Sequence, residues 1–193
     1  AYDDEIKSLG GKIYCIPSRK KGITKNKKAL EIFFSKHKEY KIIHQHVSSL
    51  SYIEPIKIAF KFGFPTRIIH SRNTQQGGLF LHKYLHKYNQ RKINIFATDF
   101  FACSDLAAKW LYGNKRYNDK KYKIIKNGIN TDKFQFNENI RIKIRKQLDV
   151  KDEIVIGNVA RFHPQKNHMF LLDIFKYILK KLPSSKLILV GDG

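Results

Sequence analysis

Apolar residues in this chain follow two patterns that alternate along its length. Short runs of branched and aromatic residues, which are typical of buried strands, lie at 12–17, 41–48, 66–69, 96–104, 122–126, 154–159 and 187–190. Apolar residues three or four positions apart predict helices around 30–34, at 53–62 and 105–112, and from 168 to 182, and a more polar helix is expected at 138–148. Strands that alternate with helices form a mainly parallel sheet with helices on both faces, so the predicted fold class is α/β.

Two domains are expected, joined by the stretch from Gly128 to Asp152. The strand that begins at Ile154 opens a second series of strand and helix. We therefore assign residues 1–150 to a first domain that includes the connection, and residues 151–193 to the start of a second. The sequence begins with Ala and stops directly after a predicted strand, so both ends are expected to be cut.

The formal net charge of +22 indicates an anionic partner, because such a field attracts anionic lipid, nucleic acid and phosphorylated ligands. Of the 38 cationic side chains, 30 are Lys and eight are Arg. Arg is preferred where bases and phosphates are recognised by paired hydrogen bonds, so this composition favours weak attraction to an anionic membrane surface. The alternative is a basic nucleic-acid-binding protein, but the Tyr and Phe residues lie within apolar runs and are interpreted as core, so no nucleic acid is expected as a partner.

Two further observations concern the compartment. The sequence has no run of about eighteen uncharged apolar residues, so no membrane-spanning helix is predicted. Cys15 and Cys103 each lie in an apolar run and are expected to be buried free thiols, as in a reducing cytoplasm. Together with the charge, they predict a cytoplasmic protein that is peripheral to the inner face of the cell membrane.

Two cations, Arg161 and Lys166, lie in the loop between the strand at 154–159 and the following helix. Gly157 interrupts that strand and indicates a turn at its end, and Asn167 is a candidate N-cap. In open α/β sheets ligands bind at the carboxyl ends of strands, and helix N–H groups with a guanidinium and an ammonium suit a phosphate or diphosphate. Spacing alone leaves open that both cations are solvated loop residues.

Histidines lie at the carboxyl ends of two earlier strands. His44 and His46 are two positions apart and should point to one face, but a metal site would need further ligands, so they are interpreted as polar groups at the mouth of a cleft. His70 and Arg72 end the next strand, where His70 could polarise a group or move a proton and Arg72 could bind phosphate oxygens. The alternative for His70 is a satisfied strand-end histidine. The segment 75–78 is expected to be a mobile loop that closes over a ligand.

Two other strand ends carry weaker signals. Ser104 has no nucleophile-elbow sequence around it and is predicted to cap the next helix. Gly191 and Gly193 flank Asp192 in a glycine-rich turn, which lacks the spacing of a dinucleotide site.

Six stretches occur in an order that resembles the GT-B glycosyltransferases, specifically the retaining, nucleotide-sugar-dependent enzymes of capsule and exopolysaccharide assembly. They are IIHQHVS, GFPTRIIHSRNT, ATDFFACSDLAAKWLYG, IIKNGINTDKF, IGNVARFHPQKNHMFLLDIF and LILVGDG. The resemblance implies Rossmann-like parallel sheets in two domains, of which this chain would hold the end of the N-terminal, acceptor-side domain and the start of the C-terminal, donor-binding domain. The acidic motif of the family would lie beyond Gly193.

The resemblance also implies roles for the strand-end residues. Arg161 and Lys166 would bind the donor diphosphate and stabilise the charge of the leaving nucleotide, which is why such enzymes usually need no metal or other cofactor. Gly157 and Gly191 would lie in turns on the donor side. The opposite, catalytic wall would hold the residues near the acceptor and the transferred sugar, namely His46, His70 and Arg72. Arg72 stands where the family often has a second His.

The expected function is therefore retaining transfer of a sugar from a nucleotide-sugar donor to a hydroxyl acceptor, in the synthesis of a cell-surface polysaccharide or lipid-linked glycan. The chain alone is expected to be inactive, because the donor pocket would be incomplete. A truncated, non-functional transferase is the remaining alternative.

Overall fold

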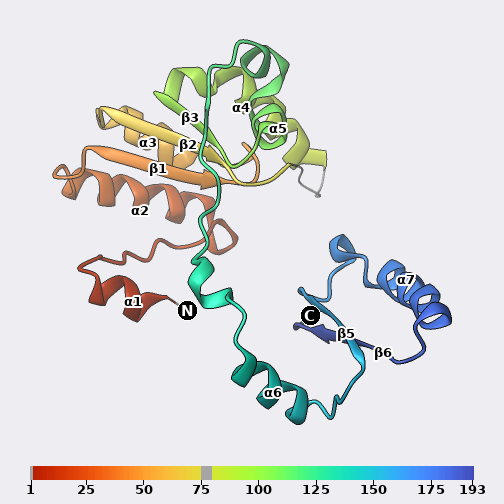
Figure 1. The fold of residues 1–193 in the computed structure, drawn as a ribbon. Helices are drawn as coiled ribbons and strands as arrows, with labels where there is room; N and C mark the ends of the chain where they lie inside the picture. Colours follow the sequence, from red (N-terminus) through yellow and green to blue (C-terminus); the bar gives the residue numbers. More distant parts are fainter. Residues whose placement is uncertain (1, 75–79) are drawn as a thin grey trace. The chain divides into compact units, whose positions relative to one another are not determined.

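The computed structural model describes residues 2–74 and 80–193 (Figure 1). Contacts within the chain divide it into two compact units, residues 1–128 and residues 129–193. The domain boundary that we predict from the sequence, near residue 150, is not tested by this division. By its contacts, the segment 129–150 belongs to the second unit.

The first unit contains a four-stranded sheet in the order β1-β2-β3-β4, in which all neighbouring strands are parallel. The strands are β1 (Ile42–Val47), β2 (Thr66–Ser71), β3 (Asp99–Ala102) and β4 (Lys123–Ile124). The helices are α1 (Asp3–Ser8), η1 (Arg19–Lys21), α2 (Ile23–Lys36), α3 (Glu54–Lys61), α4 (Phe80–Phe96) and α5 (Asp105–Asn118). This alternation of strands and helices confirms the predicted α/β class for the unit.

Two apolar clusters hold the first unit together. The larger one joins the sheet to α3, α4 and α5, and its fully buried members include Leu50, Ile53, Ile56, Ile69, Ile93 and Leu111. The smaller one packs α2 against α3 through Leu30, Phe34, Ile58, Ala59 and Phe64. Burial of such side chains is the main favourable contribution to folding, so these clusters fix the positions of β1 and β2.

Local signals set the ends of the helices beside the sheet. Pro55 lies in the first turn of α3, and Gly63, which follows this helix, has φ +75°, a conformation that suits glycine after a helix. The Ser104 hydroxyl accepts a hydrogen bond from the Ala107 N–H at 3.2 Å, which confirms the predicted cap of α5. Gly113 interrupts α5 with a non-helical conformation.

The second unit contains a parallel pair of strands, β5 (Ile154–Val159) and β6 (Ser185–Val190). Its helices are η2 (Thr131–Phe134), α6 (Glu138–Gln147), η3 (Pro164–Lys166) and α7 (His168–Lys181). The apolar side chains of β5 are only partly covered, so the prediction of a buried strand is wrong: Val159 is 82% exposed. A sheet of two strands with one following helix covers too little of either face to bury them.

Three sequence predictions differ from the structure in the first unit. Residues 12–17 form no strand; Tyr14 packs instead against Phe33 of α2, with ring centroids 4.9 Å apart. Cys15 is consequently exposed, and Cys103 is only partly buried, so the expectation of buried thiols is wrong for Cys15. Helix α4 was not predicted. The predicted loop at 75–78 lies outside the described residues.

No helix in the described part of the chain is both long and apolar enough to cross a membrane.

Candidate functional site

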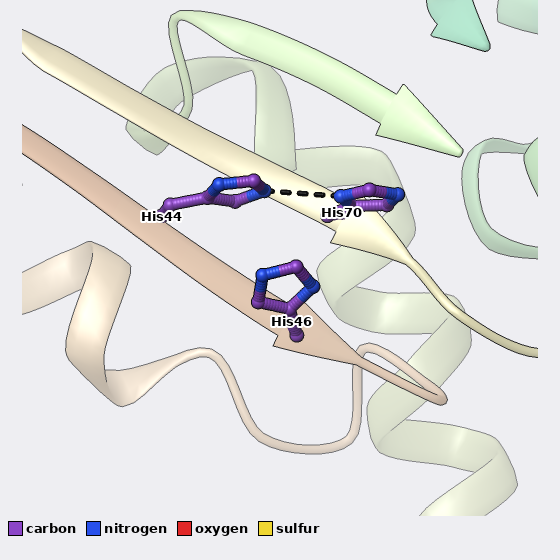
Figure 2. A group of neighbouring side chains, drawn as sticks. All are labelled: His44, His46 and His70. Carbon is purple, nitrogen blue, oxygen red and sulfur yellow. Dashed lines mark hydrogen bonds between the residues drawn. The ribbon is translucent and has the colours of Figure 1, made fainter. Parts of the chain in front are cut away.

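Three histidines gather at the carboxyl ends of β1 and β2 (Figure 2). His44 and His46 point to the same face of β1, as their spacing predicts, and their rings stack with centroids 4.2 Å apart. His70 lies on β2 directly opposite His46 in the parallel register, with ring centroids 4.9 Å apart. The sheet register therefore brings together residues that are 24 positions apart in the sequence.

The three rings differ in exposure. His70 is 1% exposed, whereas His44 and His46 are exposed to solvent. The ring of Phe101, from β3, meets both His70 and His44 edge-on, at centroid distances of 6.0 and 5.7 Å. The His70 side of the cluster is therefore buried, and the side formed by His44 and His46 is open to solvent.

Hydrogen bonds define the protonation of His70. The Arg72 Nη1 lies 3.4 Å from His70 Nε2, and His70 Nδ1 lies 3.0 Å from His44 Nε2. A guanidinium can only donate, so Nε2 of His70 accepts, and the neutral ring carries its proton on Nδ1, which donates to His44. This assignment follows from the network of donors and acceptors.

The surroundings keep these imidazoles neutral. Burial, with additional repulsion from His46, Arg72 and His44, lowers the pKa of His70 from 6.5 to about 4. Desolvation also lowers the pKa values of His44 and His46, with Arg72 as a further cause for both. At neutral pH the cluster therefore offers uncharged nitrogen lone pairs beside the permanent charge of Arg72.

Backbone and side-chain bonds hold the end of β2 in place. The Ser71 hydroxyl is buried and donates to the Ala107 carbonyl oxygen at 2.7 Å, and the Arg72 N–H donates to the Val47 carbonyl oxygen at 2.9 Å. The Cys103 N–H donates to the Ser71 carbonyl oxygen at 3.0 Å. The backbone of Arg72 is therefore held at the end of β2, and its side chain is exposed.

The two cations of the second unit lie in the loop after β5. The Phe162 N–H donates to the Asp192 carbonyl oxygen at 2.8 Å, which ties this loop to the segment after β6. Arg161 and Lys166 are exposed, and within residues 2–74 and 80–193 neither takes part in an ion pair. Both charges are thus available to an anionic ligand.

Two glycines were predicted to lie in turns and Asn167 to cap a helix, and the structure agrees with these predictions to different degrees. Gly157 is paired with Ile188 inside β5, so the prediction of a turn at Gly157 is wrong. Gly191 follows β6, where a side chain would clash with the Ala160 carbonyl oxygen, so a close backbone approach requires glycine. Asn167 occupies the N-cap position of α7 in a left-handed conformation, without a capping hydrogen bond from its side chain.

Sequence reasoning recognised His46, His70 and Arg72 but missed that His44 bonds to His70. The sequence did indicate that these histidines lie near each other, because both strands were predicted and parallel strands align their carboxyl ends at one edge of a sheet. What the sequence lacked was the register between the two strands.

Comparisons with known proteins agree with these observations. No protein-family model matches the chain. It is 29% identical over its whole length to EpsF of Bacillus subtilis strain 168, which is named as a glycosyltransferase, and spans 51% of that protein. It is 26% identical, over 99% of its length and 50% of the relative's, to a UDP-Gal:alpha-D-GlcNAc-diphosphoundecaprenol alpha-1,3-galactosyltransferase of Escherichia coli. The structure of HepE from Anabaena, in complex with UDP and glucose, matches with a TM-score of 0.69 at 19% identity, over 100% of this chain and 51% of HepE.

The chain is therefore related to glycosyltransferases, and it spans about half the length of the curated relatives it matches. The likeness to HepE confirms the predicted fold class, Rossmann-like parallel sheets of the GT-B glycosyltransferase type.

Proposed function

We propose, from this relationship to glycosyltransferases, that the chain carries donor-binding and acceptor-side residues of an enzyme that transfers a sugar from a nucleotide-sugar donor to a hydroxyl group. The observation that supports this most strongly is the convergence of His46, His70 and Arg72 at one sheet edge. Ligands of open α/β folds bind at this edge.

In the first unit, the proposed acceptor-side groups are neutral imidazoles next to one guanidinium. His46 is exposed, and its uncharged ring can accept a hydrogen bond from the acceptor hydroxyl. His70 is held by Arg72 and His44, so it acts as a fixed polar group at the base of the site. Arg72 carries a permanent positive charge beside these imidazoles and can attract an anionic group of a ligand.

In the second unit, Arg161 and Lys166 are the proposed donor diphosphate ligands. During transfer the bond between the anomeric carbon and the diphosphate oxygen breaks, and its electron pair leaves with the nucleotide. The acceptor oxygen forms the new bond, and its proton passes to the departing diphosphate oxygen. Two exposed cations close to the start of α7 would stabilise the departing diphosphate, as a metal ion does elsewhere. Gly191, with Gly157 in the strand before the loop, is proposed to lie on the donor side.

The finer features of the reaction are carried over from the relatives. The Escherichia coli enzyme is named for a UDP-Gal donor and a diphosphoundecaprenol-linked acceptor. We extend this to a nucleotide-sugar donor and a glycan or lipid-linked acceptor for the present chain. Retention of the anomeric configuration is proposed from the sequence resemblance alone. The net charge of +22, most of it from Lys, supports a peripheral position on an anionic membrane surface, which we propose to be on the cytoplasmic side. The position of Tyr and Phe within apolar runs supports the proposal that nucleic acid is not a partner.

The donor-side assignment is tested by measuring UDP binding to the chain with calorimetry. Arg161→Ala and Lys166→Ala should each weaken binding by at least about tenfold, because each removes a charged hydrogen-bond donor. Lys176→Ala is the matched control, since this lysine is exposed on α7 away from the loop. Equal UDP affinity in all four proteins would contradict the proposed diphosphate site.

A further inference from the structure

We propose that His44, His46 and His70 form a binding site for a borderline divalent transition metal ion such as Zn²⁺. Each residue offers one ring nitrogen, and these three atoms all lie within 4.8 Å of one another. The sequence offered only the pair on β1, and the neighbouring strand supplies the third ligand (Figure 2). The site uses His46 and His70, which are also the proposed acceptor-side groups, so a bound ion and the acceptor hydroxyl would compete for the His46 lone pair. The proposed diphosphate ligands belong to the other unit.

The spacing of the nitrogens suits a single ion. Zinc bound to imidazole at about 2.0–2.1 Å in a tetrahedron holds its ligand atoms about 3.3–3.4 Å apart. His44 Nε2 and His70 Nδ1 lie 3.0 Å apart, in a hydrogen bond that the ion would replace, and one ring nitrogen of His46 completes a set of three atoms within 4.8 Å of one another. Coordination therefore requires the rings to turn so that the three lone pairs converge on one ion.

The chemistry of the donors selects the class of ion. Three imidazoles without a carboxylate favour Zn²⁺, Co²⁺, Ni²⁺ or Cu²⁺ over Mg²⁺ and Ca²⁺, which prefer oxygen ligands. In the parts of the chain that the structure describes, His46 has ring contacts but no hydrogen-bond partner, so its lone pair is available. The exposed side of the cluster leaves the fourth position open to water.

The position of Arg72 leads to a specific prediction, namely that metal binding and the Arg72–His70 contact exclude each other. Coordination through His70 Nδ1 moves the ring proton to Nε2, which then cannot accept from the guanidinium. Metal binding must therefore break this 3.4 Å contact, after which Arg72 can turn toward solvent. Its positive charge nevertheless opposes the ion. Metal binding and the Arg72 contact are thus alternatives, and Arg72→Gln should tighten metal binding.

The test is a titration of the full chain, purified without a polyhistidine tag, with Co²⁺ followed by visible absorption and then displaced by Zn²⁺. We expect a four-coordinate cobalt spectrum at one equivalent. His44→Gln and His46→Gln, both at exposed positions that leave the core intact, should each weaken binding by at least about tenfold. His163→Gln is the control, because this histidine is exposed in the second unit and caps η3.

The outcomes separate this site from adventitious binding. Loss of affinity in both β1 variants, a gain in Arg72→Gln and no change in His163→Gln would support it. Equal affinity in His44→Gln and the control, or no binding up to about 1 mM metal, would overturn it. Because the readout is metal affinity rather than sugar transfer, failure here leaves the proposed transferase function standing, and the reverse also holds.

Discussion

His44 Nε2 and His70 Nδ1 lie 3.0 Å apart, although the two residues belong to different strands and are 26 positions apart in the sequence. The contact links an exposed ring on β1 to a ring on β2 that is 1% exposed. With Arg72 on the far side of His70, it forms a directed chain from guanidinium to buried imidazole to exposed imidazole. The orientation of that chain is set by Arg72, which can only donate.

This chain predicts the tautomer of His70. At neutral pH its proton should reside on Nδ1, with Nε2 as the acceptor, and two-bond ¹H–¹⁵N correlation spectra of labelled histidine distinguish the two forms. In Arg72→Gln the preference should weaken, since a glutamine amide can donate or accept. A wild-type His70 protonated on Nε2 would contradict the proposed network.

His86 predicts a loss of stability in acid. It is buried on α4, accepts a hydrogen bond from the Leu50 N–H at 3.1 Å, and stacks on Trp110 with centroids 4.5 Å apart. Burial, with the nearby Lys87, lowers the pKa of His86 from its ordinary value of 6.5. The unfolded chain therefore binds this proton more readily, so the stabilising contribution is complete above about pH 6.5 and is lost as the pH falls toward the folded pKa.

The measurement is the free energy of unfolding in urea at about pH 7.5 and about pH 5.5. The difference between the two pH values should be smaller in His86→Gln, which cannot titrate, than in the wild type. His163→Gln, altered at an exposed histidine, should keep the wild-type difference. A pH dependence unchanged by His86→Gln would show that His86 does not couple protonation to folding.

Gly191 predicts a steric limit on the segment after β6. A Cβ at this position would clash with the Ala160 carbonyl oxygen, which is backbone and cannot turn away. Gly191→Ala should therefore lower the free energy of unfolding of the second unit by about 1–3 kcal/mol. Gly157→Ala is the matched control, because its Cβ would meet open space, and it should change stability by less than about 1 kcal/mol. Equal effects of the two substitutions would be inconsistent with this close approach.

In the first unit, apolar periodicity predicted several elements correctly. Strands β1 and β2 and helices α2, α3 and α5 all carry apolar residues at the expected period. Two of the three buried residues of the missed helix α4, His86 and Asn89, are polar, so the apolar pattern on its inner face is weak. Residues 12–17 were wrongly predicted to form a strand. Their run of branched and aromatic residues is typical of a strand, but Tyr14 packs against Phe33 of α2 instead of pairing in a sheet.

The candidate site was predictable in its residues but not in its contacts. The carboxyl ends of predicted strands pointed to His46, His70 and Arg72, since those ends meet at one edge of a parallel sheet. The His44–His70 contact depends on which residues face each other across β1 and β2, and this register arises from packing of the whole unit. The exposure of Arg161 and Lys166 likewise depends on the loop after β5 and its tie to Asp192.

We propose that Arg161 and Lys166 bind the diphosphate of a nucleotide, and thermal unfolding with matched ligands tests this central claim most directly. Both residues belong to the chain, although the acidic motif of the donor pocket would lie beyond Gly193. UDP should raise the midpoint of unfolding in a concentration-dependent way, because a ligand that binds only the folded state stabilises it. Uridine, which lacks the diphosphate, and an RNA oligonucleotide should give a much smaller shift. No shift with UDP, or an equal shift with uridine or the oligonucleotide, would contradict the account.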